Sequence, residues 1–457
     1  MRKFSEMNCM EFNKNSQKFY IETYGCQMNV VDSEVVISIM QQEGFSVTED
    51  INKANIILIN TCSVRENAEQ RVWGRLNVFK QIKNKKPELL VAVIGCMAER
   101  LKEKLIEKEK FIDLVIGPDS YRNLPQLLHT VKIGQKVVNV ILSDKETYAD
   151  INPVRMNKNN VTAFVSIMRG CNNLCSYCVV PYTRGRERSK NPDSIICEIR
   201  GLINKGYREV TLLGQNVDSY KYKNQENEKI INFAKLLEMV AKLDSGLRIR
   251  FSTSHPKDMS DEVLYTMARY KNICNSIHLP LQSGSSRILK LMNRGYTREW
   301  YMDRIKTIKK ISPGCSISTD IMTGFCAETE EDHQETLSLM KWAEYDFAYM
   351  FKYSERPGTK AAKKLEDDVP EKVKLKRLTE IINLQNELSQ KSKIKDLNNI
   401  YEVLIEGTSK KSDNHFFGRN SQNKVVVFPK ENFKIGNYVS VKITDCTSAT
   451  LIGKAVK

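Results

Sequence analysis

From residue 17 to residue 142, short apolar runs alternate with longer stretches of helical period. Buried strands that alternate with helices are typical of a parallel sheet covered on both faces. We therefore predict an N-terminal parallel α/β domain over residues 17–142. Its predicted strands are residues 19–23, 55–60, 89–94 and 113–116, and its predicted helices are residues 32–42, 64–83 and 98–107.

The same alternation continues with a higher count over residues 157–392, after a polar stretch at 143–160 that we interpret as an interdomain linker. Six strand–helix units are fewer than the eight of a complete parallel barrel. We predict an open (β/α)6 partial barrel resembling a TIM barrel, followed by a charged helix at about 370–393. The predicted strands are residues 162–168, 209–213, 248–252, 276–279, 316–321 and 347–351.

Residues 394–457 change character, with short β-rich runs separated by turns that contain glycine. This pattern favours a small barrel resembling an OB fold, a shape that often binds RNA. A stabilising β module without RNA binding is an equally good interpretation of composition alone. The predicted strands are residues 402–406, 424–428, 438–443 and 451–455.

Charge and composition narrow the class of protein. The 457 residues carry 71 Lys and Arg against 55 Asp and Glu, a formal net charge of +16, which suits a polyanionic partner but also favours solubility. The longest apolar stretches, such as residues 89–94, are too short to span a bilayer. The first twenty residues lack the apolar core of a secretion signal. We expect a cytoplasmic protein with no membrane partner, and a monomer.

Three of the twelve cysteines lie close together, at Cys171, Cys175 and Cys178, directly after the first predicted barrel strand. In a reducing compartment, cysteines serve metals or catalysis more often than disulfides. Thiolates hold iron–sulfur clusters, usually four to a cluster. With three, one iron keeps an open position that can bind a substrate, as in other catalytic metal sites. The alternatives are unrelated buried cysteines and a zinc knuckle, for which the loop lacks a fourth ligand.

A second set, Cys26, Cys62 and Cys96, is spaced widely, but each member comes just after a predicted strand of the first domain. The carboxyl ends of parallel strands open onto one crevice, where ligands bind. Three thiols that arrive there together can share one metal cluster. The alternative is three unrelated small core residues.

The spacing Cys-x-x-x-Cys-x-x-Cys after the first strand of a partial barrel resembles the radical S-adenosylmethionine enzymes. With the second cysteine set, the chain resembles their methylthiotransferase branch, which adds an N-terminal cluster domain and a C-terminal TRAM domain. This resemblance implies two 4Fe-4S clusters per chain and S-adenosyl-L-methionine as cofactors. It rests on residues 23–29, 60–67 and 95–99 for the N-terminal cysteine motifs and on residues 278–285 and 318–321 for the barrel motifs.

Within that family, residues 178–188 most resemble the branch that makes 2-methylthio-N6-dimethylallyladenosine next to the anticodon of tRNA. The resemblance implies that a radical removes a hydrogen from carbon 2 and that the N-terminal cluster supplies sulfur. It further implies that a second S-adenosylmethionine supplies the methyl group. Where the family commonly has Pro-Gly, this chain has Cys326-Ala327, which alters a turn beside the barrel.

Other functions remain open. Sister branches act on threonylcarbamoyl-adenosine in tRNA or on an aspartate of a ribosomal protein. A metal-stabilised RNA-binding protein without catalysis is a further alternative, although a set of three ligands argues against it. As partners we expect tRNA, a low-potential electron donor of the flavodoxin or ferredoxin type, and a sulfur donor for the N-terminal cluster.

Arginines and strand-end residues complete the predicted site. Arg184, Arg186 and Arg188 suit contacts to RNA, unless they form a solvated loop or salt bridges. Strand ends hold the active sites of parallel barrels, so we expect residues there to contact S-adenosylmethionine. His255 and His278 also lie at predicted strand ends. Each is equally well explained as a histidine of a packed loop whose hydrogen bonds are made within the protein. Tyr177, which lies between two cysteines of the close set, is a further predicted cofactor contact, with a simple packing role as an equal alternative. The predicted contacts at strand ends are Gln215, Asn216, Thr253, Gln282 and Asp320.

Overall fold

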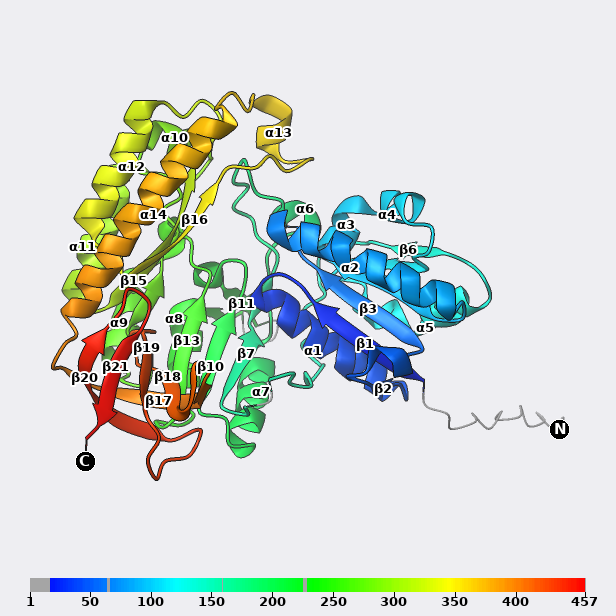
Figure 1. Cartoon of the computed structure of the whole chain (residues 1–457), viewed down its shortest axis with the longest axis horizontal. Helices are drawn as coiled ribbons and strands as arrows, with labels where there is room; N and C mark the ends of the chain where they lie inside the picture. The colour runs from blue at the N-terminus through cyan, green and yellow to red at the C-terminus, as the bar shows by residue number, and fades with distance from the viewer. Residues whose placement is uncertain (1–16, 64–65, 158, 225–227, 457) are drawn as a thin grey trace.

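The computed structural model describes residues 17–63, 66–157, 159–224 and 228–456. Figure 1 shows three parts: an N-terminal α/β domain, a central half-open barrel with helices on its outside, and a small β-barrel below the central one. The predicted fold of each part, α/β for the first two and a small β-barrel for the third, is confirmed. Within the described residues, no helix is both long and apolar enough to cross a bilayer.

The N-terminal domain is a six-stranded parallel sheet in the order β2-β1-β3-β4-β5-β6. All four predicted strands form, and two short edge strands, β2 and β6, were not predicted. The predicted helix at 98–107 is two helices, because the backbone breaks at Lys102, which has φ 53°. The elements are β1 (Lys18–Thr23), α1 (Gln27–Gln42), β2 (Ser46–Val47), β3 (Ile56–Thr61), α2 (Glu66–Lys85), β4 (Leu90–Gly95), α3 (Cys96–Leu101), α4 (Glu103–Lys108), β5 (Leu114–Ile116), α5 (Leu124–Lys132) and β6 (Val137–Asn139).

The central domain has six parallel strands in two three-stranded sheets, β13-β10-β7 and β14-β15-β16. A single bridge between Ile249 and Ile273 joins the two sheets. The strands are β7 (Thr162–Ser166), β10 (Glu209–Leu213), β13 (Arg248–Ser252), β14 (Ser276–His278), β15 (Ser316–Thr323) and β16 (Phe347–Lys352). The helices outside them are α7 (Pro192–Asn204), α8 (Phe233–Ala241), α9 (Asp261–Arg269), α10 (Ser286–Leu291), α11 (Arg298–Ile311), α12 (Glu330–Ala343), α13 (Lys360–Lys364) and α14 (Glu371–Ile394).

Two short ribbons and a short helix lie outside the two sheets of this domain. A two-stranded ribbon, β8 (Met168–Arg169) with β9 (Arg188–Ser189), encloses the cysteine loop and the short helix α6 (Val180–Arg184). A second ribbon pairs β11 (Lys221–Lys223) with β12 (Ile230–Asn232). The loop that contains the three clustered cysteines is therefore anchored at both ends by strand pairing.

The C-terminal part is a closed barrel of five strands in the order β17-β18-β19-β21-β20. The strand that was not predicted is β18, whose first residues, Ser412 to His415, are polar. Two arginines of the central domain hold this barrel: Arg248 donates to the carbonyl oxygen of Arg419 (2.6 Å), and Arg250 donates to that of Asn420 (2.7 Å). The strands are β17 (Ile400–Ser409), β18 (Ser412–Arg419), β19 (Val425–Pro429), β20 (Tyr438–Cys446) and β21 (Leu451–Ala455).

The segment predicted as a linker has almost no regular structure, yet it is packed against both domains. Arg155 forms ion pairs with Glu34 of α1 (2.8 Å) and with Glu198 of α7 (2.5 Å). Tyr148 is buried and donates a hydrogen bond to the carbonyl oxygen of Pro118. The first two domains are therefore tied together by the chain that connects them.

Candidate active site

The first cysteine set, called the N-terminal trio (Cys26, Cys62 and Cys96), lies at the carboxyl ends of three adjacent strands. Cys26 caps α1 after β1, Cys62 follows β3, and Cys96 begins α3 after β4. Cys62 and Cys96 are buried. A hydrogen bond to Cys62, assisted by the charge of Arg184, lowers the pKa of Cys26 to about 6 although burial opposes this. The trio is thus gathered at one edge of the sheet.

Gly25 allows this close approach. Its φ of +121° is a conformation that side chains rarely adopt. A β-carbon at this position would lie 2.3 Å from the β-carbon of Cys62. The glycine before Cys26 is therefore a requirement of the trio and not a feature of the turn alone.

The second set, called the core trio (Cys171, Cys175 and Cys178), lies on the loop between β8 and α6. Cys175 is buried, whereas Cys171 and Cys178 are half-buried. Burial raises the pKa of both Cys171 and Cys178 to about 12, so both thiols are neutral unless a metal takes the sulfur. Gly170 precedes the trio, and a β-carbon there would lie 1.9 Å from the carbonyl oxygen of Arg186.

One arginine connects the two trios. Arg184 ends α6, which begins two residues after Cys178, and its Nε donates to Cys96 Sγ at 3.2 Å. A helix of five residues is only about 7.5 Å long. From the other side, Cys26 packs against a small apolar cluster that includes Leu213, the last residue of β10. Both trios therefore lie at the same end of the barrel.

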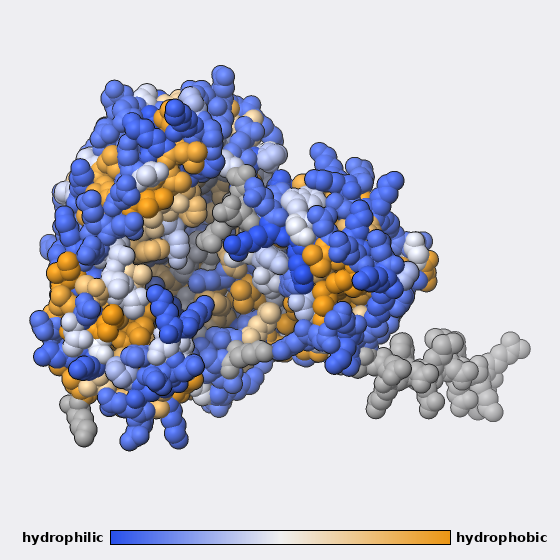
Figure 2. Space-filling view, viewed as in Figure 1, coloured by the Kyte–Doolittle hydropathy of each residue, from blue (hydrophilic) through white to orange (hydrophobic). Residues whose placement is uncertain are grey.

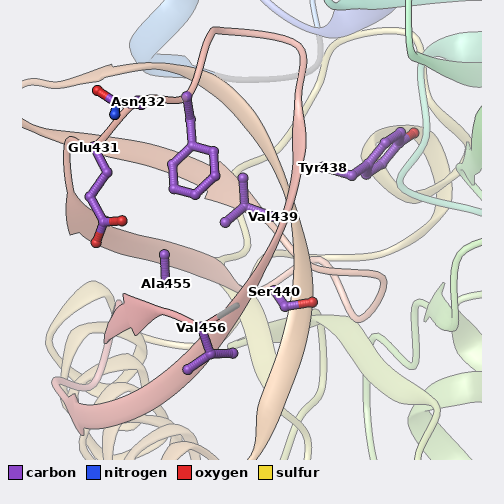
Figure 3. A pocket seen from close by; sticks show the side chains of 8 residues that line it. Glu431, Asn432, Tyr438, Val439, Ser440, Ala455 and Val456 are labelled. Carbon is purple, nitrogen blue, oxygen red and sulfur yellow. The ribbon is translucent and has the colours of Figure 1, made fainter.

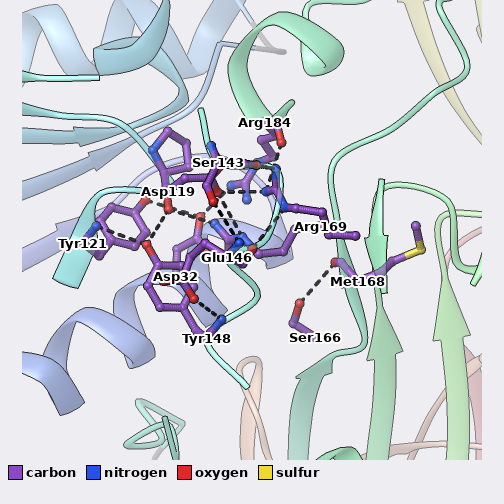
Figure 4. A network of polar contacts seen from close by, with 12 residues as sticks. Asp32, Asp119, Tyr121, Ser143, Glu146, Tyr148, Ser166, Met168, Arg169 and Arg184 are labelled. Carbon is purple, nitrogen blue, oxygen red and sulfur yellow. Dashed lines mark hydrogen bonds and ion pairs between the residues drawn. The ribbon is translucent and has the colours of Figure 1, made fainter. Parts of the chain in front are cut away.

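Arg184 belongs to a buried set of charges between the first two domains, the interdomain charge cluster (Asp32, Asp119, Arg169, Arg184 and Arg188), drawn in Figure 4. Asp32 accepts from Arg184 (2.7 Å) and Arg169 (2.8 Å), and Asp119 accepts from Arg188 (2.9 Å). Although burial opposes it, the two guanidinium groups hold the pKa of Asp32 below its usual value. The predicted RNA contacts Arg184 and Arg188 are thus engaged inside the protein, and Arg186 alone of the three is exposed.

A second buried arginine, which the sequence analysis missed, lies beside the core trio. Arg294 donates to Cys175 Sγ at 3.3 Å and to the hydroxyl of Tyr177 at 3.5 Å. Its Nε donates to the hydroxyl of Tyr296, and its Nη2 donates to the carbonyl oxygen of Pro280. Each trio therefore has one arginine at a thiol.

Several predicted cofactor contacts have polar atoms that lack protein partners. Among the described residues, no hydrogen bond reaches Gln215 Oε1, Asn216 Oδ1 or either ring nitrogen of His255. The carboxylate of Asp258 lies 4.0 Å from Nδ1 of His255. Burial, followed by the charge of Arg294, lowers the pKa of His255 to about 2, so its ring is neutral. Unsatisfied buried polar atoms at the ends of β10 and β13 fit a polar ligand.

Two further predicted contacts have unusual backbones. Thr253 and Gln282 have φ of 76° and 73°, and such conformations of residues with side chains cluster at functional sites. Asp320 lies on the inner face of β15, where His278 Nε2 is 3.4 Å from its carboxylate and His278 Nδ1 is 3.0 Å from Ser318 Oγ. His278 is therefore a satisfied histidine, whereas His255 is not.

The donor chemistry of both trios fits iron–sulfur clusters. No cysteine of the described residues is in a disulfide. Arg184 Nη1, next to the N-terminal trio, has no hydrogen-bond partner in the part of the chain that the structure describes, which fits a negatively charged group there. In that same part, no three Cys, His, Asp or Glu side chains are placed to hold a single metal ion. The cluster assignment therefore rests on where the thiols lie and what surrounds them.

Comparisons with known proteins agree with this division of the chain. Residues 18–117 match a family model described as uncharacterized protein family UPF0004, residues 165–340 match the radical SAM superfamily, and residues 396–456 match the TRAM domain. A tRNA-2-methylthio-N(6)-dimethylallyladenosine synthase of Amoebophilus asiaticus is 58% identical over 449 residues, which cover 96% of this chain and 92% of the relative. The chain belongs to this synthase family.

A second synthase of the same name, from Bacteroides thetaiotaomicron, is 57% identical over 442 residues and covers 97% of each chain. Among solved structures, the radical S-adenosylmethionine methyltransferase TsrM from Kitasatospora setae, with cobalamin and a 4Fe-4S cluster bound, has a TM-score of 0.56. It is 14% identical and covers 76% of this chain and 74% of that one, so it shows the fold alone.

A depression on the C-terminal barrel lies apart from this site. Its volume is about 640 Å³, and Glu431, Phe433 and Val439 are among the side chains that line it (Figure 3). Its lining residues include no cysteine, histidine or arginine. The side chains that line this depression belong to neither trio.

Proposed function

We propose that this protein is a tRNA methylthiotransferase, which replaces the hydrogen on carbon 2 of N6-dimethylallyladenosine beside the anticodon with a methylthio group. The observation that carries the proposal is the meeting of two thiol trios at one end of a half-open barrel. It is supported by 58% identity to a synthase of that name over nearly the whole chain.

The core trio would hold one 4Fe-4S cluster and the N-terminal trio the other. When bound, the core cluster would supply the electron that cleaves S-adenosylmethionine, and the radical formed from S-adenosylmethionine would take the hydrogen atom from carbon 2. Arg294 and Arg184 place a positive charge beside each set of thiolates. Gln215 and Asn216 offer unpartnered oxygens to the amino group of S-adenosylmethionine.

An aromatic strip on the edge strand β16 supports binding of unpaired bases. Phe347, Tyr349 and Phe351 alternate along β16 and are exposed on its inner face, while Ala348 between them is buried against α14. Figure 2 shows a hollow between the barrel, the C-terminal barrel and the N-terminal domain, and β16 borders it. Aromatic rings stack on unpaired bases of RNA. We assign this strip to the anticodon loop.

The TRAM barrel continues this surface. Lys424, one residue before β19, pairs with Asp346, which immediately precedes Phe347, at 3.1 Å. The tRNA can therefore contact the small barrel and the aromatic strip together. We further propose a cytoplasmic monomer that takes electrons from a flavodoxin or ferredoxin and receives sulfur from a separate donor.

The matched variants Cys62→Ala and Cys175→Ala test the assignment of the two trios. Purified without oxygen, the wild type should hold about eight irons per chain and each variant about four. Cys175→Ala should form no deoxyadenosine, whereas Cys62→Ala should form it but methylthiolate no tRNA. The buried Cys315 lies in neither trio, so Cys315→Ala should keep about eight irons. Deoxyadenosine at an undiminished rate in Cys175→Ala would refute the core assignment.

Nucleoside mass spectrometry of tRNA from a deletion strain identifies the substrate. We expect dimethylallyladenosine to accumulate without its methylthio group. Loss of the methylthio group from threonylcarbamoyl-adenosine would point to the sister tRNA branch, and an unchanged tRNA profile would point to the ribosomal protein. A protein that binds tRNA but never cleaves S-adenosylmethionine would be a binding protein only.

A further inference from the structure

A depression on the outer surface reaches a ligand of the core trio. It has a volume of about 620 Å³, and Cys171 forms part of its wall together with Leu142, Leu174, Tyr182 and Arg186. Cys175 of the same loop is instead buried against Arg294. Cys171 is thus the thiol of the core trio through which the site meets the surface.

The wall of this depression is unusually apolar for an exposed surface. Leu174 is 56% exposed, Tyr182 is 48% exposed and Leu142 is 38% exposed. Ile141, next in the chain to Leu142, is exposed as well. Single exposed apolar residues are normal, but a group of them around one hollow marks an interaction site.

Two exposed cations, Arg186 and Lys363, flank the apolar wall, while the half-buried Glu187 accepts a hydrogen bond from the backbone N–H of Asn172. Arg186 is exposed and forms no ion pair within the described residues, unlike its neighbours Arg184 and Arg188. Lys363 of α13 lies with its Nζ 6.0 Å above the ring of Tyr182. One acidic residue, Asp144, is in the lining. The depression therefore suits a partner with an acidic rim around an apolar centre.

We propose that this depression is the docking site of a small, acidic, low-potential electron-transfer protein of the flavodoxin or ferredoxin type. This inference rests on the proposed function, because a cluster at the core trio must gain one electron before each cleavage of S-adenosylmethionine. The donor loses one electron and the cluster gains it, and no bond or proton moves in that step. Electron-transfer encounters have small interfaces and are steered by charge.

An RNA would be a poorer occupant of the same place. Among the side chains of the wall, Tyr182 offers the one ring on which a base could stack. The aromatic strip of β16, by contrast, has three rings in a row. The charges agree with this division, since Arg186 alone of the three arginines predicted to contact RNA is exposed here.

Three variants outside the cysteine loop test the proposal: Leu142→Asp, Tyr182→Asp and Lys363→Glu. The measurement is the rate at which visible absorbance of the cluster bleaches when the full-length protein is mixed with a purified, photoreduced flavodoxin. Each variant should need about tenfold more flavodoxin for half the maximal rate, because acidic side chains repel an acidic donor. Dithionite, which needs no docking surface, should reduce wild type and variants at the same rate.

Matched changes elsewhere serve as controls. Leu375 is similarly exposed on α14 and Lys310 is exposed on α11, so Leu375→Asp and Lys310→Glu should leave the flavodoxin dependence unchanged. Raising the salt concentration should slow reduction of the wild type by flavodoxin and have less effect on Lys363→Glu.

The possible failures can be told apart. Unchanged flavodoxin dependence in all three variants would overturn the proposal, as would equal slowing with dithionite, which means a damaged site. Weaker tRNA binding with unchanged flavodoxin dependence would assign the surface to RNA. A wild-type cluster that is reduced but never cleaves S-adenosylmethionine would refute the proposed function and leave the docking result valid.

Discussion

The two cysteine trios have the same composition and one arginine each, but the charge of that arginine is balanced differently. Arg184, at the N-terminal trio, is paired with the buried carboxylate of Asp32 at 2.7 Å. Arg294, at the core trio, contacts a thiol, two tyrosine hydroxyls and a carbonyl oxygen, and no carboxylate within the described residues. The first cation has a carboxylate partner within the protein, whereas the second has none among the described residues.

This difference separates a structural role from a cofactor-dependent one. A buried charge without a partner is costly. Thiols lose their protons and become negatively charged thiolates when they bind a metal. Arg184 can therefore hold the two domains together whether or not a cluster is present. Arg294 gains its counter-charge only when the core trio is occupied. The predictions below test this contrast.

The largest effect should come from Arg184→Met. The change leaves Asp32 with one arginine instead of two and removes the bond to Cys96. Asp32 keeps Arg169, but the charge-assisted hydrogen bonds of Arg184 to Asp32, Asn29 and Cys96 are lost from a buried network, which together should cost about 3–5 kcal/mol. We expect the free energy of unfolding, measured with guanidinium, to fall by that amount both with and without bound iron.

The neighbouring exposed arginine provides the control. Arg186→Met removes an arginine side chain two positions further along the chain, where it is exposed and forms no ion pair within the described residues. The free energy of unfolding should therefore fall by less than about 0.5 kcal/mol. A loss in Arg184→Met that appears only in the iron-loaded protein would mean that Asp32 does not balance the charge of Arg184.

The next effect concerns the geometry of the N-terminal trio alone. Gly25→Ala places a β-carbon 2.3 Å from that of Cys62 and forces alanine into φ +121°. Strain and overpacking together should cost about 2 kcal/mol or more. Iron analysis should show about four irons per chain instead of eight, while deoxyadenosine still forms. Loss of deoxyadenosine as well would show that the two trios are not independent.

Arg294→Met should act in the opposite direction in the iron-free protein. Removing an uncompensated buried cation while keeping the apolar stem should leave the iron-free protein as stable or more stable, with a change of about 1 kcal/mol. The iron-loaded protein should instead lose stability or core iron. Guanidinium unfolding of both forms measures this reversal, and equal destabilisation of both forms would contradict it.

Sequence patterns predicted the strands of the barrel well, because their apolar runs are continuous and bounded by turns. Residues 209–213 and 248–252 are strands at the limits predicted. The pattern failed at β18, which begins with polar residues, and at the two-residue edge strand β2. Edge and barrel strands of this kind are set by pairing with neighbours and not by their own apolar content.

The same limit explains the arginines. In the sequence, Arg184, Arg186 and Arg188 alternate in one polar stretch, so nothing distinguishes the exposed one from the two that are buried. Their partners Asp32 and Asp119 lie far away in the chain and meet them only after the domains pack. Arg294 carries no motif that marks it. Thiol positions follow from local spacing, but the charges around them depend on tertiary packing.

The smallest effect should come from Ala327→Gly, in the turn between β15 and α12. The φ of 62° at Ala327 costs alanine about 1–2 kcal/mol, a strain that glycine removes. Glycine also makes the unfolded chain more flexible, which offsets about 0.4–1 kcal/mol of that gain. We expect a net gain of about 0.5–1 kcal/mol in guanidinium unfolding. Cys326, next to Ala327, packs with Tyr177 behind the core trio. The gain in stability should therefore appear in the core domain and leave the iron content of both trios unchanged. Ala327→Val should lose stability, because a branched side chain tolerates positive φ least.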